Sequence, residues 1–344
     1  MLRNLFFNLL LLLLIGGLLS SCSLNKAPKI DVLSTAPTPE LLFKINASIV
    51  KVNAATKEGG RGVGSGVVVA KNHIVTNCHV IANSRGVSVT QFGYSYSPHA
   101  LIADWENDMC ILKFKYLELN PVKLSTNNFL EYGTKVFGKS YGGNTVKPHT
   151  SFGRVRGIHQ LNKNNFKVIQ SSAWFAMGAS GGGLFNYKGE LIGITTFKTP
   201  GHTAFYYSMP VEIIKKMLID GKESSITTQP KLPFWDTPTE NQPFFMQVVG
   251  PIKNESWSEL KKITTKWIHE NPMDIEGLYH HAFTLYKLEK FILAKNIFHK
   301  IIKKNNKHAL AYLYLYKIAN KENHQDDMSY YKSRVLKLDD SLIN

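Results

Sequence analysis

Three hydrophobic patterns follow one another along this chain of 344 residues. Residues 5–19 form an almost unbroken apolar run. From about residue 46 to residue 220, apolar residues come in short runs rich in valine and isoleucine, separated by glycine and polar turns, which is typical of β-strands. From Ser256 onward they recur every three or four positions, which predicts amphipathic helices. We therefore expect an N-terminal leader, a β-rich domain and a C-terminal all-α domain.

The N-terminal apolar run is typical of an export signal. Arg3 supplies its positive end, and Gly16 and Gly17 interrupt a stretch that is shorter than the about 20 residues of a membrane-spanning helix. It ends in the sequence LSSC, which resembles a bacterial lipobox whose cysteine becomes the lipidated first residue. A transmembrane anchor and plain secretion are the alternatives. We predict a lipoprotein signal over residues 1–22, with lipid on Cys22.

The next segment, residues 23–45, is expected to be a tether, because its first part is rich in proline, lysine and serine. Ser23 is not the aspartate that often retains lipoproteins at an inner membrane, so an outer membrane is favoured. The expected location is the periplasm or the cell envelope, with the membrane reached through the lipid anchor.

The stretch MGASGGGLFN, residues 177–186, surrounds Ser180 with residues that have almost no side chain. A serine nucleophile needs a sharply turned backbone, free N–H groups beside it and no bulk in the path of the carbonyl. A purely structural tight turn is the alternative. The motif therefore indicates a nucleophile only if a base and an orienting group lie elsewhere.

Two apolar segments upstream supply these partners. The stretch IVTNCHVI, residues 74–81, starts as a strand and ends with His79, which places an imidazole where it can reach a cleft. Asp108 directly precedes another apolar strand, so its carboxylate lies at the start of that strand. Taken singly, the two residues also fit a structural histidine and a turn aspartate. The order His79, Asp108, Ser180 is that of chymotrypsin-like enzymes among the convergent triads.

Several motifs resemble, in order, the trypsin-like peptidase domain of the HtrA/Deg family of exported bacterial serine proteases. The resemblance covers about residues 59–219. It rests on GSGVVVAKNHIVTNCHV, DWENDMCILK, GTKVFGKSYGG, TSFGRVRGI, GASGGGLFNYKGELIGITT and AFYYSMPVEIIKKML. It implies an all-β, chymotrypsin-like double β-barrel over residues 46–220, with six strands in each barrel.

The resemblance also implies a role for each site residue. His79 would take the proton of Ser180 and return it to the leaving amine, while Asp108 would hold the imidazole. The backbone N–H groups of Gly178 and Ser180 would bind the oxyanion, without any metal or organic cofactor. Ala179 stands where the family usually has asparagine. The alternative function is therefore a catalytically degenerate lipoprotein that acts as a binding scaffold through its helices.

The same resemblance implies a short, apolar specificity pocket. Trp174 falls at its floor, and Thr196, Phe197, Lys198 and Phe205 fall on its walls. The tryptophan offers no carboxylate to pair with a basic side chain, so we predict cleavage after small aliphatic residues. The alternative is that Trp174 belongs to the core.

The cysteines are few. If Cys22 carries lipid, Cys78 and Cys110 remain, and both lie in apolar, strand-like runs where a free cysteine behaves as a small hydrophobe. An exported compartment permits a disulfide without requiring one. We favour two buried thiols over a bridge.

Residues 221–255 are rich in proline and polar residues and are expected to form a linker. Its four aromatic residues indicate that part of it packs on the barrels; they are Phe234, Trp235, Phe244 and Phe245.

Residues 256–344 resemble tetratricopeptide repeats, because a shift of 34 residues superposes Leu278 on Tyr312 and Ala282 on Tyr316. A plain helical hairpin bundle is the alternative. Either arrangement implies a protein partner at the helical repeats rather than chemistry.

The net charge is +16, from 41 basic and 25 acidic side chains. Nucleic acid is not an expected partner of an exported lipoprotein, so attraction to an anionic membrane or cell-wall polymer fits better. His280, His281 and His299 lie on predicted helices without a cysteine or carboxylate to complete a ligand set, so no metal site is expected. The expected partners are protein or peptide substrates.

Overall fold

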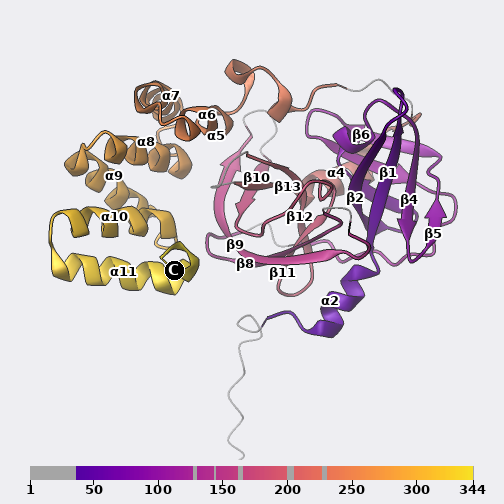
Figure 1. Cartoon of the computed structure of the whole chain (residues 1–344), viewed down its shortest axis with the longest axis horizontal. Coiled ribbons are helices and arrows are strands. Elements are labelled where there is room, and N and C mark those ends of the chain that lie inside the picture. Colours follow the sequence, from indigo (N-terminus) through magenta and orange to yellow (C-terminus); the bar gives the residue numbers. More distant parts are fainter. Residues whose placement is uncertain are drawn as a thin grey trace, which may run out of the picture. The chain divides into compact units, whose positions relative to one another are not determined.

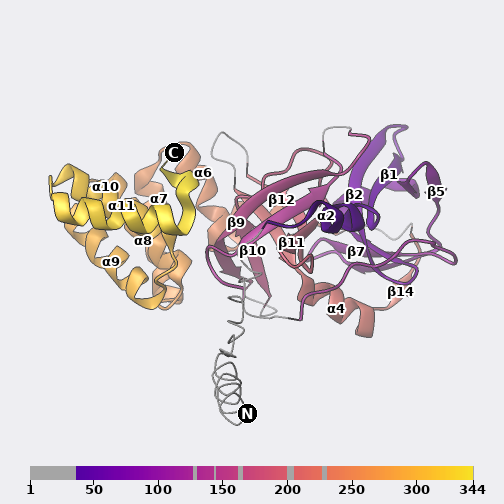
Figure 2. The same ribbon diagram turned by 90° about the horizontal axis from the view of Figure 1, so that it is seen from below.

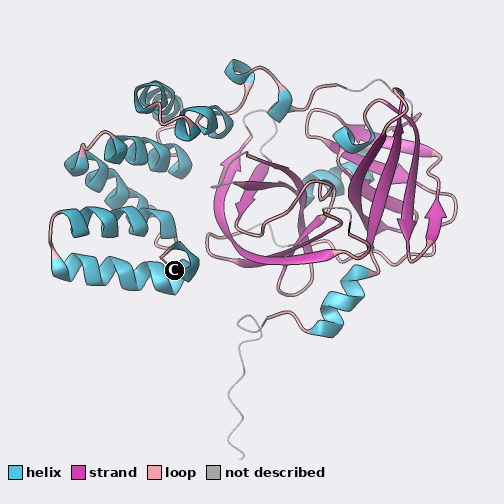
Figure 3. Cartoon of the chain, viewed as in Figure 1, coloured by secondary structure: helices cyan, strands magenta, loops and turns pink. Residues whose placement is uncertain are grey.

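The computed structural model describes residues 36–126, 130–142, 145–161, 166–199, 205–226 and 231–343. The predicted lipoprotein signal, with Cys22, and the first part of the predicted tether lie outside these residues. The described residues begin with a β-rich part and end with an all-α part, as predicted (Figure 1, Figure 3). Over the same ranges, no helix has both the length and the apolar character needed to cross a membrane.

The first sheet contains eight antiparallel strands in the order β14-β6-β7-β3-β2-β1-β4-β5. The two strands at its ends pair on one side only, so the hydrogen bonds do not close it. We predicted a closed six-stranded barrel here, and that prediction is wrong, because the linker contributes β14 to one edge and a short hairpin ends the other. The strands are β1 (Ile49–Thr56), β2 (Arg61–Ala70), β3 (His73–Thr76), β4 (Ser84–Gln91), β5 (Tyr94–Tyr96), β6 (Ala100–Asp104), β7 (Met109–Lys113) and β14 (Glu223–Ser224).

The second sheet is a closed barrel in the order β10-β13-β12-β11-β8-β9, which confirms the prediction for this half. Its strand β12 is buried at seven of its eight positions, and Phe137 stacks on Phe185 inside the barrel with ring centroids 5.4 Å apart. The strands are β8 (Lys135–Ser140), β9 (His149–Gln160), β10 (Lys167–Ser171), β11 (Gly183–Asn186), β12 (Leu191–Lys198) and β13 (Tyr206–Pro210).

Two helices pack on these sheets. Helix α4 (Val211–Asp220) contacts β7 of the first sheet as well as β12 and β13 of the barrel (Figure 2). Helix α2 (Pro39–Asn46) lies at the end of the predicted tether. A proline is well tolerated in the first turn of a helix, and the side chain of Thr38 accepts a hydrogen bond from the N–H of Leu41. The end of the predicted tether is therefore helical, and this helix buries Ile45.

The predicted packing of the linker aromatics on the barrel is confirmed. Phe244 and Phe245 are buried in the same core as the barrel strands, with Phe234 and Trp235 packed against it. The ring of Phe245 stacks on His159 of β9 with centroids 4.5 Å apart. The linker elements are η1 (Phe234–Asp236), η2 (Thr239–Asn241), α5 (Phe244–Gln247) and α6 (Val249–Lys253).

Five helices follow, and each contacts the next along the chain. They are α7 (Trp257–Glu270), α8 (Ile275–Lys287), α9 (Phe291–Lys304), α10 (Ala309–Lys321) and α11 (Gln325–Asp339), before the short η3 (Asp340–Leu342). Helices α8 and α10 begin 34 residues apart, as do α9 and α11. Their shared apolar face buries small residues such as Ala282, Ala294 and Ala311.

A buried polar cluster joins the barrel to these helices. The hydroxyl of Tyr132 donates to Oε1 of the Glu276 carboxyl group, and the ring of His308 stacks on Tyr132 with centroids 5.1 Å apart. Arg156 adds a second link through a 3.0 Å hydrogen bond from Nε to Oδ2 of Asp339. Burial raises the pKa of the Glu276 carboxyl from 4.5 to about 8. The folded chain therefore favours the neutral form of this side chain.

We expect this carboxyl to lower the stability of the fold as the pH rises from about 4.5 to about 8. In that window the folded state retains a proton that the unfolded state releases, so the free energy of unfolding falls by up to about 1.4 kcal/mol per pH unit. The Glu276→Gln variant keeps an acceptor for Tyr132 but does not titrate. Thermal melts at both ends of the window should show a larger loss of stability in the wild type than in the variant.

Buried histidines titrate in the opposite direction, since burial lowers the pKa of His280 to about 3 and that of His308 to about 4. Their contribution is common to both proteins and cancels in the comparison. Equal pH dependence in wild type and variant would contradict the role of Glu276.

Candidate active site

The structure brings His79 and Asp108 into direct contact. His79 lies in the single turn α3 (Cys78–Ile81) that follows β3, and Asp108 is the residue before β7. The imidazole Nδ1 is 2.6 Å from Asp108 Oδ2, and the backbone N–H of His79 donates to Oδ1 over 2.8 Å. An ionised carboxylate only accepts hydrogen bonds, so Nδ1 carries the proton and Nε2 is left to exchange one. The carboxylate is buried, while the side chain of His79 is 31% exposed.

The backbone around Asp108 is held in an unusual shape. Its φ is 56°, a left-handed conformation that aspartate tolerates better than most residues. Asn77 stabilises it by donating from Nδ2 to the carbonyl of Asp108 over 2.8 Å and to Thr196 Oγ1 over 3.1 Å. Asn77 thereby connects the histidine segment, the aspartate turn and β12.

A disulfide joins Cys78 to Cys110, so the predicted pair of free thiols is wrong. Cys110 lies in β7, which pairs with β3 just before Cys78, and their Cα atoms are 5.0 Å apart. That spacing is within the range a disulfide requires. The bond ties the neighbour of His79 to the strand that begins after Asp108, so it braces the two segments that carry the pair.

Ser180 stands on a turn that only glycine permits. Gly178 and Gly181 have φ of +86° and +89°. A Cβ on Gly181 would lie 2.0 Å from the carbonyl oxygen of Ser65, and one on Gly182 would lie 2.5 Å from Cβ of Ser140. The backbone geometry therefore requires these glycines, as expected of a tight structural turn. They also leave the space around Ser180 free of side chains.

The turn leaves two N–H groups without a partner. The N–H groups of Ala179, Gly181 and Gly182 donate to backbone carbonyls over 3.1, 2.8 and 2.9 Å. By contrast, those of Gly178 and Ser180 donate to no atom of the described residues. Free N–H groups of the serine itself and of the residue two positions before it are what an oxyanion requires. The side chain of Ala179, which stands where the family it resembles has asparagine, is fully buried.

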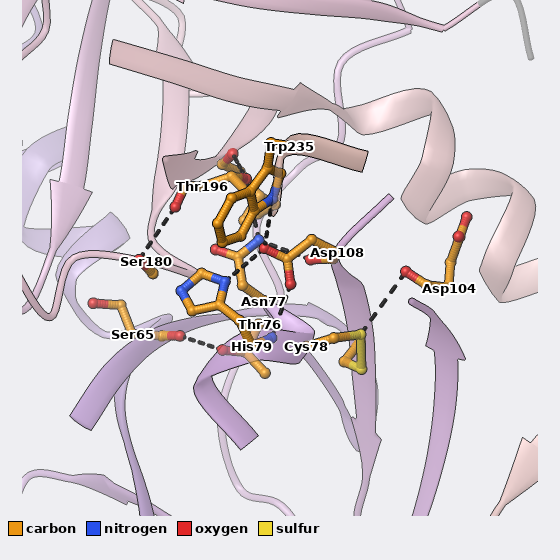
Figure 4. Close-up of polar contacts among 12 residues, drawn as sticks. Ser65, Thr76, Asn77, Cys78, His79, Asp104, Asp108, Ser180, Thr196 and Trp235 are labelled. Atoms are coloured by element: carbon orange, nitrogen blue, oxygen red, sulfur yellow. Dashed lines mark hydrogen bonds and ion pairs between the residues drawn. A yellow bond between two sulfur atoms is a disulfide. The ribbon is translucent and has the colours of Figure 1, made fainter. Parts of the chain in front are cut away.

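The hydroxyl of Ser180 points away from the imidazole in this structure. Its Oγ donates to the carbonyl of Thr196 over 3.2 Å, and within the described residues it has no hydrogen bond to His79. Figure 4 shows the ring of His79 between Ser180 and Asp108. Rotation about χ1 of the serine, which has three staggered positions, is the change that would bring Oγ toward Nε2. Such hydrogen bonds are often open in structures without substrate.

Sequence reasoning missed the part that Trp235 plays at this site. Its Nε1 donates to Asp108 Oδ2 over 3.2 Å, and its ring meets that of His79 edge to face, with centroids 5.4 Å apart (Figure 4). The ring of Phe197 stacks on the ring of Trp235, with centroids 5.7 Å apart. The proline-rich segment signalled only that an aromatic residue packs somewhere on the barrel. The position of Trp235 beside Asp108 is fixed by the backbone hydrogen bond that the N–H of Phe234 donates to the carbonyl of Glu106.

The predicted pocket residues fall into separate environments. Trp174 is 47% exposed and its ring lies 4.8 Å from that of His149, so the alternative that it belongs to the core is wrong. Thr196 and Phe197 are buried beside the His79 and Asp108 pair, whereas Lys198 is exposed at the end of β12. Phe205 is half-buried. The floor of the pocket at Trp174 stays a prediction.

The part of the chain that the structure describes contains no set of side chains that could bind a metal ion. No three histidine, cysteine, aspartate or glutamate side chains there are grouped so that they could hold an ion.

Residues 64–194 match the trypsin-like peptidase domain family. The chain is 34% identical over 244 residues to a probable periplasmic serine endoprotease, DegP-like, of Buchnera aphidicola, covering 65% of this chain and 49% of that protein. It is 30% identical over 177 residues to the periplasmic serine endoprotease DegP of Salmonella typhimurium, covering 48% of this chain and 37% of that protein. The chain thus spans at most about half the length of these relatives.

Among solved structures, the active form of the Rv3671c protease of Mycobacterium tuberculosis aligns with a TM-score of 0.48 at 20% identity. The alignment covers 57% of this chain and 91% of that one. The matched family segment contains His79, Asp108 and Ser180.

Proposed function

We propose that this HtrA/DegP-like, trypsin-like peptidase domain is an active serine endopeptidase that cuts peptide bonds of exported or envelope proteins. The observation that supports it most is that the N–H groups of Gly178 and Ser180 donate to no atom of the described residues, next to a histidine already oriented by a buried aspartate. The relatives named above are described as periplasmic endoproteases, which is consistent with this activity.

The proposed reaction has two steps. Ser180 Oγ turns from the carbonyl of Thr196 toward His79 Nε2, which takes its proton while Oγ attacks the peptide carbonyl. The developing oxyanion accepts hydrogen bonds from Gly178 and Ser180, each worth about 3 kcal/mol in related sites. His79 then gives the proton to the leaving amine, and water repeats the sequence on the acyl-enzyme. Asp108 stabilises the imidazolium throughout and keeps Nδ1 protonated.

Digestion of an unfolded protein tests this proposal. Purified chain should release fragments with new N-termini, detected by mass spectrometry, whereas the Ser180→Ala variant should release none. Cleavage that persists in the variant would exclude Ser180 as the nucleophile, and no cleavage by a folded wild type would favour the binding scaffold instead.

Trp235 is expected to tune this chemistry by holding Asp108. The Trp235→Phe variant keeps an aromatic ring against Phe197. It loses the hydrogen bond from Nε1 to Asp108 Oδ2, and among the described residues only His79 then donates to that oxygen. One hydrogen bond to a charged group is worth about 1.5–3 kcal/mol. We expect kcat to fall about tenfold with little change in KM, and the acidic limb of the pH–rate profile to move to higher pH.

The matched control is Trp257→Phe, because Trp257 packs against Phe283 in the all-α part and touches none of the site residues. An unchanged profile in Trp235→Phe, or an equal change in the control, would show that Trp235 is only structural.

We propose that the chain is exported and anchored through lipid on Cys22, in keeping with the LSSC sequence. A diacyl chain together with a basic surface provides the two signals that stable membrane attachment requires. The Cys22→Ser variant should lose incorporation of labelled fatty acid, and retained incorporation would exclude this residue.

The all-α part is proposed to be a tetratricopeptide-like partner-binding module. The 34-residue spacing between helix starts supports this, as do the small residues Ala282 and Ala294 between adjacent helices. Stacked repeats of this kind expose an extended surface that suits a protein partner.

A further inference from the structure

The first sheet has two ends, and the candidate active site lies at one of them. Strand β7 starts directly after Asp108, and β3 ends at Thr76, just before the turn that carries His79. These two strands are antiparallel neighbours, so the start of β3 at His73 and the end of β7 at Lys113 form the other end of the sheet. We call this other end the distal end. At about 3.3 Å per residue, β7 alone separates the two ends by about 15 Å.

The strand register places the start of β1 and the end of β4 at the distal end. The first residue of β1, Ile49, pairs with Val67 near the end of β2, which turns directly into β3. Lys51 of β1 pairs with Thr90 near the end of β4, so the turn from β4 to β5 lies at the distal end as well. Helix α2 leads into β1 (Figure 1), and Gln91 Nε2 donates to the carbonyl of the last helical residue over 2.8 Å.

Four exposed aromatic side chains lie at the distal end, and we call them the distal aromatic residues. They are Phe43 on α2, Phe92 and Tyr94 at the turn between β4 and β5, and Tyr116 after β7, and they are 73%, 66%, 70% and 86% exposed. The segment after β7 is held at this end because Asn72 Nδ2 donates to the carbonyl of Lys115 over 3.2 Å. A single exposed apolar side chain is common, whereas several at one end of a sheet indicate an interaction surface.

The turn that carries Phe92 breaks a local rule. Gln91 pairs with Tyr94, so the turn has two residues, and Phe92 and Gly93 both have positive φ, of 51° and 85°. Such turns favour asparagine followed by glycine, because a bulky side chain is strained at positive φ. The ring of Phe92 is mostly exposed and gains little from packing inside the chain. The aromatic residue at this position therefore points to a contact outside the folded chain.

The chain reaches the distal end from the side of the proposed lipid anchor. Cys22 and Ala36 are 14 positions apart, which limits the distance between them to about 50 Å. From Ala36 the chain continues through α2 into the start of β1. A surface that is tethered so close to a bilayer meets it at a high effective concentration.

Exposed lysines accompany the distal aromatic residues. Lys44, Lys71 and Lys115 lie in the same segments and outnumber the exposed acidic residues there, Glu40 and Glu118. Aromatic rings at the headgroup level, with ammonium groups beside them, are typical of protein surfaces at a bilayer interface. A second copy of the chain is a poorer fit, because each copy carries a net charge of +16 and the two repel each other.

We propose that the distal end is a membrane-docking surface, whose distal aromatic residues enter the headgroup region of an anionic bilayer. The proposal rests on the proposed lipid anchor, which brings this surface to the bilayer. Docking gives the anchored chain a fixed orientation, because the active site lies at the opposite end of the same sheet. The active site then faces away from the bilayer, toward exported proteins in the surrounding compartment.

An artificial tether separates docking from lipidation. The chain from Ser23 onward, which contains every residue that the structure describes, is given an N-terminal hexahistidine. It is bound to vesicles of phosphatidylethanolamine and phosphatidylglycerol that contain a small fraction of nickel-chelating lipid. A Phe92→Cys variant is labelled with the environment-sensitive fluorophore NBD, since Cys78 and Cys110 are buried in a disulfide. Emission should rise about twofold as the label enters the headgroup boundary, and nitroxide-bearing lipids should quench it.

Two variants serve as matched controls for the label. Met177→Cys places it beside the oxyanion turn, and Tyr330→Cys places it on α11; the native side chains there are 81% and 53% exposed. Neither label should respond to the vesicles. A response at residue 177 as large as that at residue 92 would overturn the proposed orientation.

A second variant tests the role of the ring without destabilising the fold. Phe92→Asn places a residue that the turn favours, so the melting temperature should not fall. The affinity of the untethered chain for the same vesicles, measured by co-sedimentation, should fall about tenfold, as expected for loss of one inserted aromatic side chain. Equal affinity of the variant and the wild type would overturn the docking role of Phe92.

These measurements distinguish failure of the docking surface from failure of the lipid anchor. A vesicle-dependent response at residue 92 supports docking even where the Cys22→Ser experiment shows that the chain is not lipidated. No response at residue 92 overturns docking, whether or not Cys22 carries lipid. A response that appears without vesicles and grows with protein concentration also overturns it, because a second copy would then cover this surface.

Discussion

The Asp108→Asn variant is expected to lose about four orders of magnitude in kcat while it stays folded, the loss that this change produces in other Ser-His-Asp triads. Three N–H groups point at the Asp108 carboxylate, from the backbone and Nδ1 of His79 and from Nε1 of Trp235. An amide presents one acceptor and one donor, so its NH₂ group must face one of these N–H groups. This clash is relieved when the imidazole of His79 adopts the other tautomer, with the proton on Nε2. That nitrogen can then no longer accept the proton of Ser180.

Three measurements isolate this effect. The melting temperature and the integrity of the Cys78–Cys110 disulfide should stay close to wild type, because the carbonyl bond from Asn77 involves only the backbone of residue 108. Steady-state kinetics should show the loss in kcat with KM little changed. A variant that retains more than about a tenth of wild-type kcat would contradict the assigned role of Asp108.

Cleavage after lysine or arginine is expected to be at least about 100-fold slower than cleavage after alanine or valine. The predicted floor residue Trp174 carries no charge, and leaving a cationic side chain unpaired in an apolar pocket costs several kcal/mol. Profiling with a library of peptides that vary only at the residue before the cut measures this ratio directly.

A Trp174→Asp variant provides the opposite case, since a carboxylate at the pocket floor should raise cleavage after basic residues. A dominant basic residue in the wild-type profile would overturn the assignment of the pocket. The same holds for a profile that Trp174→Asp leaves unchanged.

Sequence reasoning selected the three candidate reacting groups because each lies at a recognisable boundary. His79 lies in the turn that follows β3, Asp108 directly precedes β7, and Ser180 sits among glycines whose φ angles and close contacts require glycine. Neither Trp235 nor the disulfide has such a local signal. Trp235 reaches Asp108 from 127 residues away, and Cys78 meets Cys110 only because β3 pairs with β7.

The fold was predictable to a similar extent. Short valine-rich runs and helical periods separated the β-rich part from the all-α part, and the closed barrel agrees with the prediction. The open first sheet does not, because its edge strand β14 is two residues of a segment that reads as linker. The helix at Pro39–Asn46 was hidden by a proline that reads as a helix breaker in a tether but fits the first turn of a helix.

Labelling with a fluorophosphonate probe tests the central claim most directly, because the probe reacts only with a serine whose proton is removed by a neighbouring base. Wild-type chain should be labelled on a single peptide that contains Ser180, and labelling should be lost in Ser180→Ala and strongly reduced in Asp108→Asn. A folded wild-type chain that stays unlabelled, or label that persists in Ser180→Ala, would contradict the assignment of Ser180 as the nucleophile.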